Sequence, residues 1–230
     1  MSERIQKLFT NYHKKYDRAN HIYSLGIDRK WRQDAATEAI INKHMYKILD
    51  IAAGTADLAI MIADEAIEEG KSVEITGIDF NKEMLSLGRE KIRKKGINNI
   101  SLEWGDALNI EAKDSSFDVA TSAFALRNFD DINKFFKELH RVLKKNGKFV
   151  ILEMGNPDKA AQRAIFQFYF GILMRPVGYI IGIDAYKWLL KSITNFDKKK
   201  AISMLKSSGF RNVKTRSLAT GVGFLITGYK

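Results

Sequence analysis

The chain of 230 residues contains no cysteine. Disulfides, thiolate metal sites and every mechanism that uses a cysteine nucleophile are therefore excluded. Apolar runs are also short, and none approaches the roughly 20 residues that a membrane-spanning helix requires. The first residues include no apolar signal segment, so a cytoplasmic location is expected. The 4 histidines do not show the spacing of metal ligands, and we expect no bound metal.

Basic charge is plentiful but uneven. The formal net charge is +11, and the apolar content of 45% is typical of a globular protein. Residues 1–47 hold 10 lysines and arginines against 5 acidic residues, and residues 151–230 hold 13 against 4. Residues 48–150 hold 15 against 18, so the middle of the chain is slightly acidic. Basic flanks favour an anionic partner, either a membrane surface or nucleic acid. A solvated lysine-rich surface explains them equally well.

The most informative segment is residues 48–57. An apolar strand that carries Asp50 leads into a turn of small residues around Gly54, and Asp57 then opens a helical pattern. Small residues let the backbone approach a ligand, and a helix start offers unpaired N–H groups. A second strand ends in Asp79, where nucleotide-binding units place the carboxylate that holds ribose hydroxyls. We therefore expect a nucleoside cofactor.

The composition of this turn distinguishes between nucleoside cofactors. The dinucleotide fingerprint requires three glycines that seat a pyrophosphate on the helix start, whereas Gly54 is the only glycine in this turn. The carboxylate of Asp57 satisfies the positive end of the helix dipole and would repel a phosphate. A ligand with a ribose and a positive centre but no phosphate fits better, which points to S-adenosylmethionine. The alternative is an ordinary strand–turn–helix followed by a coincidental acid.

The middle of the chain alternates between strand and helix patterns. Such alternation predicts a parallel sheet with helices on both faces. Strands are expected at 47–52, 73–79, 99–104, 117–123 and 147–154, and helices at 55–69, 82–95 and 131–144. A turn at Asn146-Gly147 would separate the last of these helices from the strand that follows it.

The two ends of the chain differ from this core. Helices are expected at 3–20 and 29–45, and an aromatic-rich segment lies at 161–193. A helix at 198–208 is followed by strands at 211–218 and 223–229, which a short loop joins into an antiparallel hairpin. We therefore expect one α/β domain with a doubly wound, mostly parallel sheet. Its parts would be a helical lid at 1–46, a cofactor-binding core at 47–156, an apolar helical cover at 157–197, and a terminal helix and hairpin at 198–230.

The turn Gly105-Asp106-Ala107, together with the loop and Asp79, resembles class I S-adenosylmethionine-dependent methyltransferases, which implies their Rossmann-like fold. Other segments are more particular. In order and spacing they are similar to the ubiquinone/menaquinone biosynthesis C-methyltransferase family, from about residue 9 to the end. These segments are Tyr16-Asp17, Ser24-Leu25-Gly26-Ile27 with Trp31, Asp79-Phe80-Asn81, Phe124-Ala125-Leu126-Arg127-Asn128, Arg141-Val142-Leu143-Lys144, Asp184-Ala185-Tyr186 and Leu218-Ala219-Thr220-Gly221.

The resemblance implies a cofactor site at the ends of the strands. Gly54 and Thr55 would border the methionine part of S-adenosylmethionine, and Asp50 would orient the loop. Asp79 would accept both ribose hydroxyls, because a carboxylate only accepts hydrogen bonds and can be bidentate. The remaining members would be Asp106 at the adenine amino group, Ala107 beside the ring and Ala123 lining the pocket. For Asp106 a simple turn residue is the alternative.

The implied reaction is methylation of a ring carbon of a polyprenyl quinol, in particular demethylmenaquinol to menaquinol. Arg127 and Asn128 follow the fourth strand, and ligands bind outside the carboxyl ends of such strands. We interpret Arg127 as stabilising the developing phenolate and positioning a water, and Asn128 as orienting the ring. A surface arginine that caps a helix is the alternative. The other acceptor contacts implied are Tyr16, Asp17 and Tyr186.

The aromatic-rich segment offers more apolar surface than a linker needs. We interpret it as a cover that encloses the prenyl tail, with hydrophobic core or a homodimer contact as the alternative. Basic flanks beside an apolar cover suit an enzyme that touches the inner face of the membrane to reach a lipid-soluble substrate. An anionic membrane surface is then the expected partner, and nucleic acid is not.

The chain departs from the family pattern in several places. Ala56 stands where relatives usually carry a second glycine, so a close approach of the cofactor is strained there. Asp28 stands where they usually carry histidine, Ala125 replaces a glycine, and Lys145-Asn146-Gly147 replaces a Pro-Gly-Gly turn. These changes bear on details of substrate choice and leave the expected reaction class unchanged.

Two other functions stay open. The chain could be a class I methyltransferase for another lipid or a small phenol, or a non-catalytic cofactor-binding partner in a biosynthetic complex. Nitrogen acceptors are disfavoured, because Ala123-Phe124-Ala125-Leu126 stands where amino methyltransferases usually have Asn/Asp-Pro-Pro-aromatic. Cytosine methylation through a covalent thiol is excluded because the chain has no cysteine.

Overall fold

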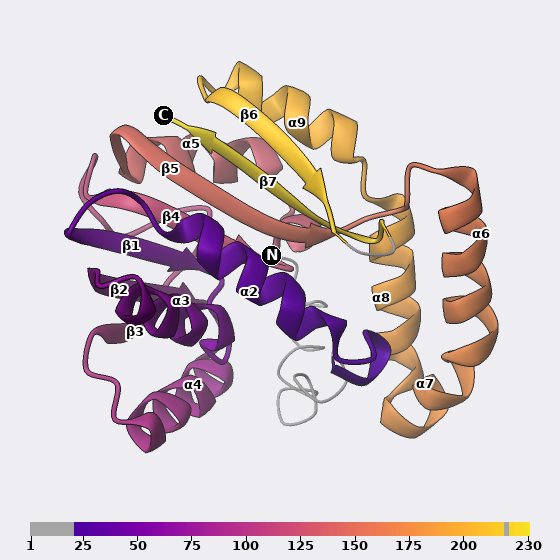
Figure 1. The fold of residues 1–230 in the computed structure, drawn as a ribbon. Helices are drawn as coiled ribbons and strands as arrows, with labels where there is room; N and C mark the ends of the chain where they lie inside the picture. Colours follow the sequence, from indigo (N-terminus) through magenta and orange to yellow (C-terminus); the bar gives the residue numbers. More distant parts are fainter. Residues whose placement is uncertain (1–20, 219–220) are drawn as a thin grey trace.

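The carboxyl ends of five parallel strands lie at one edge of a sheet, and this edge positions the site. The computed structural model describes residues 21–218 and 221–230 (Figure 1). The predicted helix at 3–20 lies outside the described residues, and so do Tyr16 and Asp17. The described strands are β1 (Met45–Ile51), β2 (Ser72–Asp79), β3 (Ile100–Trp104), β4 (Phe117–Ala123), β5 (Leu143–Met154), β6 (Arg211–Ser217) and β7 (Gly223–Tyr229).

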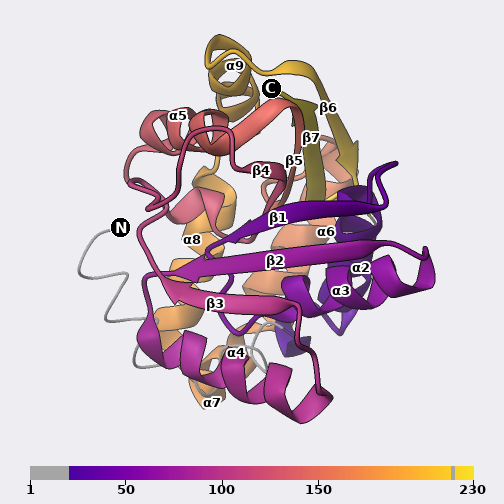
Figure 2. The ribbon, with the colours of Figure 1, turned by 90° about the vertical axis from the view of Figure 1, so that its left-hand side faces the viewer.

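The described strands form one seven-stranded sheet in the order β3-β2-β1-β4-β5-β7-β6. The pairs β1–β2, β1–β4, β2–β3 and β4–β5 are parallel, whereas β7 runs antiparallel to both β5 and β6. Figure 2 shows β1, β2 and β3 side by side at the near end of the sheet. The predicted α/β fold, with a parallel centre and a terminal antiparallel hairpin, is confirmed.

Helices cover both faces of the sheet because its strands alternate in the direction of their side chains. Val150 and Leu152 of β5 belong to one buried cluster, and Phe149 and Ile151 belong to a second. The first cluster includes side chains of α2 and α3, and the second includes those of α5 and α9 (Figure 1). The helices are α2 (Ile27–Ala39), α3 (Asp57–Glu68), α4 (Lys82–Lys95), α5 (Ile132–Val142), α6 (Ala160–Phe168), α7 (Arg175–Ile181), α8 (Ile183–Asn195) and α9 (Lys198–Ser207), with the 3-10 turn η1 (Leu126–Asn128) and the π-helical turn η2 (Tyr169–Leu173).

The helices α6, α7 and α8 form a group beside the carboxyl edge of the sheet (Figure 1). They come from the segment that the sequence marks as an apolar cover. Phe166, Phe170 and Tyr186 are buried in the first cluster, whereas Phe168 and Ile172 are more than half exposed. The segment therefore has one face inside the protein and one apolar face toward solvent.

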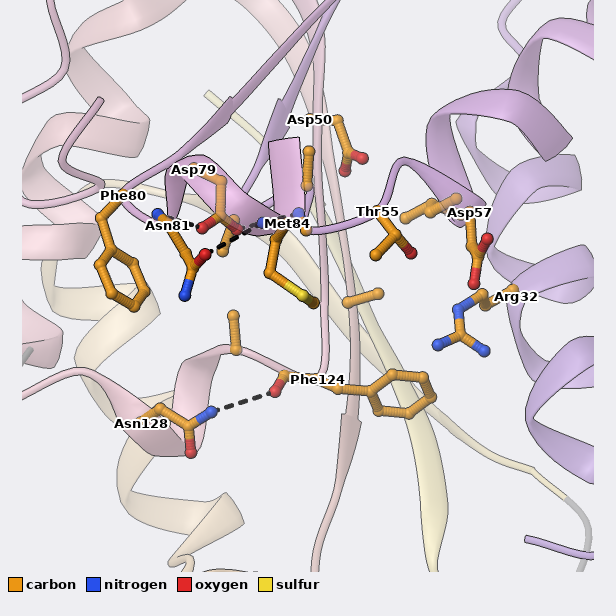
Figure 3. A pocket seen from close by; sticks show the side chains of 16 residues that line it. Arg32, Asp50, Thr55, Asp57, Asp79, Phe80, Asn81, Met84, Phe124 and Asn128 are labelled. Atoms are coloured by element: carbon orange, nitrogen blue, oxygen red, sulfur yellow. Dashed lines mark hydrogen bonds between the residues drawn. The ribbon is translucent and has the colours of Figure 1, made fainter. Parts of the chain in front are cut away.

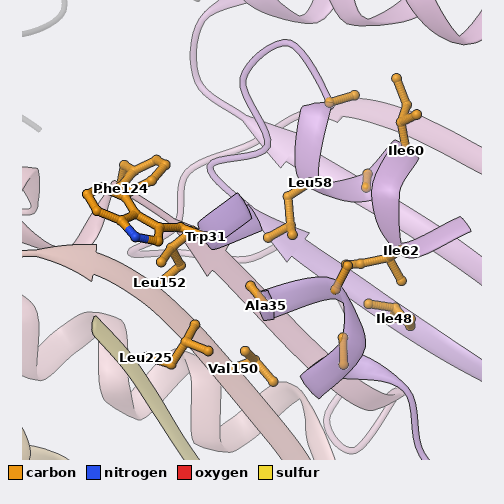
Figure 4. Packing of buried hydrophobic residues seen from close by; sticks show 14 of the residues in the cluster. Trp31, Ala35, Ile48, Leu58, Ile60, Ile62, Phe124, Val150, Leu152 and Leu225 are labelled. Carbon is orange, nitrogen blue, oxygen red and sulfur yellow. The ribbon is translucent and has the colours of Figure 1, made fainter. Parts of the chain in front are cut away.

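The helix α2 packs on the sheet through Trp31 and a row of alanines. Figure 4 shows Trp31 beside Phe124 and Leu152, with Ala35 lower along the same helix. A Cβ atom at Gly223 of β7 would lie 2.8 Å from the Trp31 ring, so only glycine leaves room for the indole there. The packing of α2 thus depends on a residue near the other end of the chain.

Two predicted boundaries are wrong. The helix predicted at 29–45 ends at Ala39, because β1 begins at Met45 to pair with Ser72. The helix predicted at 131–144 ends at Val142, and β5 begins at Leu143, which pairs with Phe117. The predicted Asn146-Gly147 turn is a bulge inside β5, where Asn146 has a φ of +62° and the register with β4 shifts.

Candidate functional site

A central cavity of about 670 Å³ lies where β1, β2 and β4 end (Figure 3). The loop after each strand contributes to its wall, as expected for the carboxyl edge of a doubly wound sheet. Six of the residues predicted from the sequence line it, namely Asp50, Gly54, Thr55, Asp79, Ala123 and Asn128. The structure therefore brings together side chains from three separate strand ends.

Asp79 ties the first two loops together. Its Oδ2 accepts a hydrogen bond of 2.9 Å from the Gly54 N–H, and its Oδ1 accepts one of 2.8 Å from the Asn81 N–H. Burial raises the pKa of Asp79 to about 6, and the N–H groups of Asn81, Gly54 and Phe80 oppose this rise. A carboxylate has about four lone-pair sites, so three N–H groups leave one of them to a ligand.

Asp50 contributes a buried acceptor to the same cavity. Its Oδ1 accepts a hydrogen bond of 2.7 Å from the Thr121 hydroxyl, whereas its Oδ2 has no partner among the described residues. Burial raises the pKa of Asp50 to about 7, the nearby charge of Asp79 adds to the rise, and Thr121 and Arg32 oppose it. A buried oxygen without a partner is costly, so Asp50 is suited to a ligand that donates hydrogen bonds or carries positive charge.

Left-handed backbone conformations cluster around this cavity. Ala52, Gly54 and Ala56 have φ angles of +58°, +55° and +64°, and Phe124 on the facing loop has +59°. Each non-glycine residue in this region costs about 1–2 kcal/mol. The strain expected at Ala56 thus lies in its own backbone, at the residue that precedes α3.

Lys91 of α4 holds the start of α3. Its Nζ donates to the Thr55 hydroxyl at 2.9 Å and pairs with the Asp57 carboxylate at 2.6 Å. A Cβ atom at Gly88 would lie 3.2 Å from the backbone carbon of Thr55, so glycine lets α4 approach the loop closely. The small-residue loop is therefore supported from outside the cavity.

Asp106 and Ala107 line a neighbouring cavity of about 610 Å³. This cavity shares Ala52, Asp79 and Phe80 with the central one, so the two are adjacent. The Asp106 carboxylate also accepts a hydrogen bond of 2.9 Å from the Leu108 N–H. Asp106 therefore stabilises its own turn, which is the alternative that the sequence left open. It also lines the same cavity as Asp79.

Asn128 lies in η1 on the β4 side of the central cavity. Its amide nitrogen donates to the Phe124 carbonyl at 3.3 Å (Figure 3). Its buried Oδ1 has no hydrogen-bond partner among the described residues. The side chain therefore offers a second free acceptor to a ligand.

The prediction that Arg127 faces the reacting ring is not what the structure shows. Its side chain is 2% exposed and forms a buried ion pair with Glu153, and it lines neither the central cavity nor the apolar cavity described next. The guanidinium also donates to the Phe124 carbonyl at 2.9 Å and to the Ser192 hydroxyl at 3.2 Å. The alternative of an exposed capping arginine is also wrong. Arg127 braces the turn that carries Phe124 and Asn128.

An apolar cavity of about 880 Å³ lies on the other side of Phe124. Trp31, Phe166 and Leu189 are among its mainly apolar wall residues, and Phe124 lines both cavities. The predicted acceptor contact Tyr186 does not line it. The Tyr186 hydroxyl instead donates to the Phe170 carbonyl, and its ring lies 5.8 Å from that of Tyr23.

Sequence reasoning missed Arg32 and Phe124 as wall residues. Arg32 lines the central cavity from α2, and its guanidinium lies 4.9 Å from the Phe124 ring centroid. Its only signal in the sequence is a spacing of four residues from Asp28, which is typical of a helical ion pair. That spacing does not reveal that the pair faces a cavity.

A sequence profile of the ubiE/COQ5 methyltransferase family matches residues 1–230. The chain belongs to this family. It is 38% identical to a demethylmenaquinone methyltransferase of Staphylococcus saprophyticus, over 99% of this chain and 97% of that protein. It is 35% identical to a demethylmenaquinone methyltransferase of Bacteroides fragilis, over 100% of this chain and 93% of the other. The predicted family and enzyme class are confirmed: the protein is a methyltransferase that uses S-adenosylmethionine.

Solved structures support the same fold. A SAM-dependent methyltransferase of Aquifex aeolicus superposes with a TM-score of 0.61 at 18% identity, covering 86% of this chain and 88% of that one. At this identity the likeness concerns the fold alone. It agrees with the doubly wound sheet and its terminal hairpin.

The residues of the central cavity fit the methyl donor. Asp50, Asp57 and Asp79 make its wall acidic, which suits a sulfonium and an ammonium group and disfavours a phosphate. The buried Oδ2 of Asp50 has no hydrogen-bond partner among the described residues, and a ligand with an ammonium group would supply one. Gly54 has a φ of +55°, which glycine adopts without strain, and it adds no side chain to this part of the cavity.

Proposed function

We propose that this enzyme methylates a ring carbon of a polyprenyl quinol and converts demethylmenaquinol to menaquinol. The observation that carries the proposal is the wall shared by the two cavities, because Phe124 lines both the acidic central cavity and the apolar cavity. A donor in the first cavity and a prenyl tail in the second would bring the methyl group and the quinol ring together at this wall. The names of the curated relatives support the same acceptor.

On the donor side, each predicted residue has a defined task. Asp79 accepts the two ribose hydroxyls at the end of β2, beside its bonds from the Gly54 and Asn81 N–H groups. Gly54 and Thr55 border the methionine part. The role expected for Asp50, orienting the loop, is replaced by a ligand contact, because its Oδ1 is bonded to Thr121 of β4 and its Oδ2 is free for a donor group of the ligand. Asp106 receives the adenine amino group, Ala107 packs beside the ring and Ala123 closes the wall. When bound, S-adenosylmethionine supplies a methyl group activated by its sulfonium.

On the acceptor side, a quinol hydroxyl that passes its proton to solvent makes the neighbouring ring carbon electron-rich. That carbon takes the methyl group, S-adenosylhomocysteine leaves, and the proton lost from the ring carbon restores the hydroxyl. We assign the orientation of this ring to Asn128, whose free Oδ1 accepts a hydrogen bond from the quinol hydroxyl that stays protonated. Arg127 acts indirectly, because its bond to the Phe124 carbonyl fixes the turn that carries Asn128. Apolar walls exclude water, which would otherwise compete for the methyl group.

The prenyl tail would occupy the apolar cavity. Leu25 and Ile165 line this cavity and are also more than half exposed, so its mouth lies at the protein surface. Tyr186 supports the cover from inside, through its bond to Phe170. The predicted substrate contacts of Tyr16 and Asp17 remain predictions.

Parallel assays with two quinols test the acceptor. Purified enzyme and S-adenosylmethionine are given either a demethylmenaquinol or a benzoquinol with the same short prenyl tail. We expect mass spectrometry to detect one added methyl on the naphthoquinol ring. Preference for the benzoquinol would contradict the proposed acceptor. Binding of S-adenosylmethionine without turnover on either quinol would favour a non-catalytic partner.

We further propose that the enzyme docks on an anionic membrane surface through its helical cover. Phe168, Ile172 and Leu173 are each at least half exposed on this cover. Arg163 and Arg175 are exposed in the same segment, which suits an anionic lipid surface. No helix within the described residues has the length and apolarity needed to cross a membrane. Contact at the surface would present the mouth of the apolar cavity to a lipid-soluble quinol.

A further inference from the structure

Arg32 is held in place from one side only. It forms an ion pair with Asp28, one turn earlier on α2, and its side chain is 8% exposed. Asp28 also accepts a hydrogen bond of 2.8 Å from the Ser24 hydroxyl, and the His21 ring nitrogen lies 3.3 Å away. Among the described residues, Asp28 is the only hydrogen-bond partner of the Arg32 guanidinium. The remaining N–H groups of the fork are therefore available to a ligand.

The charge of Asp28 keeps this arrangement stable. Burial alone would raise its pKa, but the Ser24 hydroxyl and the Arg32 guanidinium outweigh burial, and the pKa lies below its usual value. Asp28 is therefore ionised at neutral pH and stays paired with Arg32. A fixed counter-ion orients the guanidinium before any ligand arrives.

Charged side chains of both signs line the central cavity. Its described wall holds three carboxylates, Asp50, Asp57 and Asp79, and a single basic side chain, Arg32. Figure 3 shows Arg32 at the Thr55 and Asp57 end, away from the end with Asp79 and Phe80. A ligand held by Asp79 through its ribose would extend its other end toward Arg32.

We propose that Arg32 binds the α-carboxylate of S-adenosylmethionine, so that α2 supplies the anion-binding part of the donor site. The proposal rests on the donor assigned to the central cavity above. A guanidinium fork matches a carboxylate in a bidentate geometry, which lysine cannot reproduce. This end of the ligand is its only anionic group, and Arg32 is the only described cation on the wall.

Arg32 also connects the central cavity to the apolar cavity. The Arg32 guanidinium lies over the Phe124 ring, and Phe124 and Asp28 both line the apolar cavity. The Trp31 ring lies 6.4 Å from the Phe124 ring. A carboxylate bound to Arg32 therefore fixes the wall against which the acceptor ring would rest.

Decarboxylated S-adenosylmethionine provides a direct test, because it lacks only the group in question. Titration calorimetry measures the affinity of each compound for the full chain. We expect the wild type to bind S-adenosylmethionine roughly ten- to a hundredfold more tightly than the decarboxylated compound. Arg32→Met should abolish this preference by weakening only the carboxylated ligand, and Arg32→Lys should retain part of it.

Two further variants separate binding from folding. Arg29→Met is the matched control, because Arg29 is exposed on the same helix, and it should keep the full preference. Arg32→Met leaves Asp28 buried without its cation, so the Asp28→Asn/Arg32→Met variant removes both charges and should also lack the preference. The proposal would be overturned if folded Arg32→Met or folded Asp28→Asn/Arg32→Met still preferred S-adenosylmethionine over the decarboxylated compound as strongly as the wild type does. A wild type that binds neither compound would overturn the proposed function and this proposal with it.

Discussion

At the scale of single residues, the two buried carboxylates at the strand ends make the site sensitive to pH. Burial raises the pKa of Asp50 to about 7 and that of Asp79 to about 6. An aspartate in the unfolded chain titrates near pH 4, so the folded protein binds more protons between about pH 4 and pH 7. The free energy of unfolding should therefore fall as the pH rises through this window.

The variant Asp50→Asn tests this linkage. An asparagine Oδ1 still accepts the Thr121 hydroxyl but carries no charge, so the variant should be the more stable protein at pH 8, by on the order of 2 kcal/mol. Near pH 5 the free energies of unfolding of the variant and the wild type should differ much less. Urea unfolding at both pH values measures the difference, and parallel pH profiles for variant and wild type would contradict the assigned cause.

Arg127 should matter for stability more than for chemistry. Glu153 is fully buried and receives the Arg127 guanidinium as well as the backbone N–H groups of Arg127 and Met154. Arg127→Met leaves this carboxylate without its cation, which should cost roughly 3–5 kcal/mol in urea unfolding. The Arg127→Met/Glu153→Gln variant should recover most of that loss. A stable Arg127→Met protein with a large loss of turnover would instead restore a direct role at the ring.

Among the secondary-structure elements, α2 determines whether the central cavity has a cationic side chain, Arg32, at one end. α2 carries both Trp31, which packs on the sheet, and Arg32, which reaches the cavity. The loop after β1 and the start of α3 are fixed separately, by Asp79 and Lys91. A shift of α2 alone should therefore weaken ligand binding without disturbing the loop.

Gly223→Ala is expected to produce such a shift. Its Cβ atom would lie 2.8 Å from the Trp31 ring, and overpacking of this kind costs about 1–3 kcal/mol. Thermal unfolding should show the loss of stability, and calorimetry should show weaker binding of S-adenosylmethionine. Gly171→Ala is the control, since a Cβ atom there meets no atom of the described structure within 4 Å. Equal stability and equal ligand affinity of the two variants would contradict this prediction, because they would show that α2 accommodates the added Cβ atom.

At the scale of the whole molecule, the basic charge and the exposed apolar cover predict reversible binding to anionic vesicles. Exchanging both Phe168 and Ile172 for serine should reduce flotation with these vesicles roughly tenfold or more, because each buried apolar side chain contributes about 1.5–3 kcal/mol. Higher salt should weaken the binding of the wild type.

Ile67→Ser is the control for this experiment, because Ile67 is also more than half exposed but lies on α3, outside the helical cover. It should float like the wild type. Unchanged flotation of the Phe168/Ile172 variant would contradict membrane docking. A solution dimer that the same two changes dissociate would assign the apolar face to self-association.

The central sheet and the acids at its strand ends could be predicted from the sequence. These features depend on local signals: apolar runs for β1, β2 and β4, the small-residue turn at Gly54, and Asn81, whose side chain caps α4 by accepting the Met84 N–H. Neighbouring residues set such signals, and the alternation of strands and helices then brings the carboxyl ends of parallel strands to one edge. The residues that line the central cavity from these strand ends could be predicted for this reason.

Long-range packing determines which arginine lines the central cavity. Arg127 follows β4 and was expected at the ring, but Glu153 on β5 draws its side chain into a buried pair. Nothing in the sequence indicates that Arg32 reaches a cavity. The packing of Trp31 against Gly223 nevertheless brings Arg32 to the central cavity. Both outcomes depend on partners far away in the chain, because the direction of a long side chain follows from its charge partner and the packing around it, and local patterns determine neither.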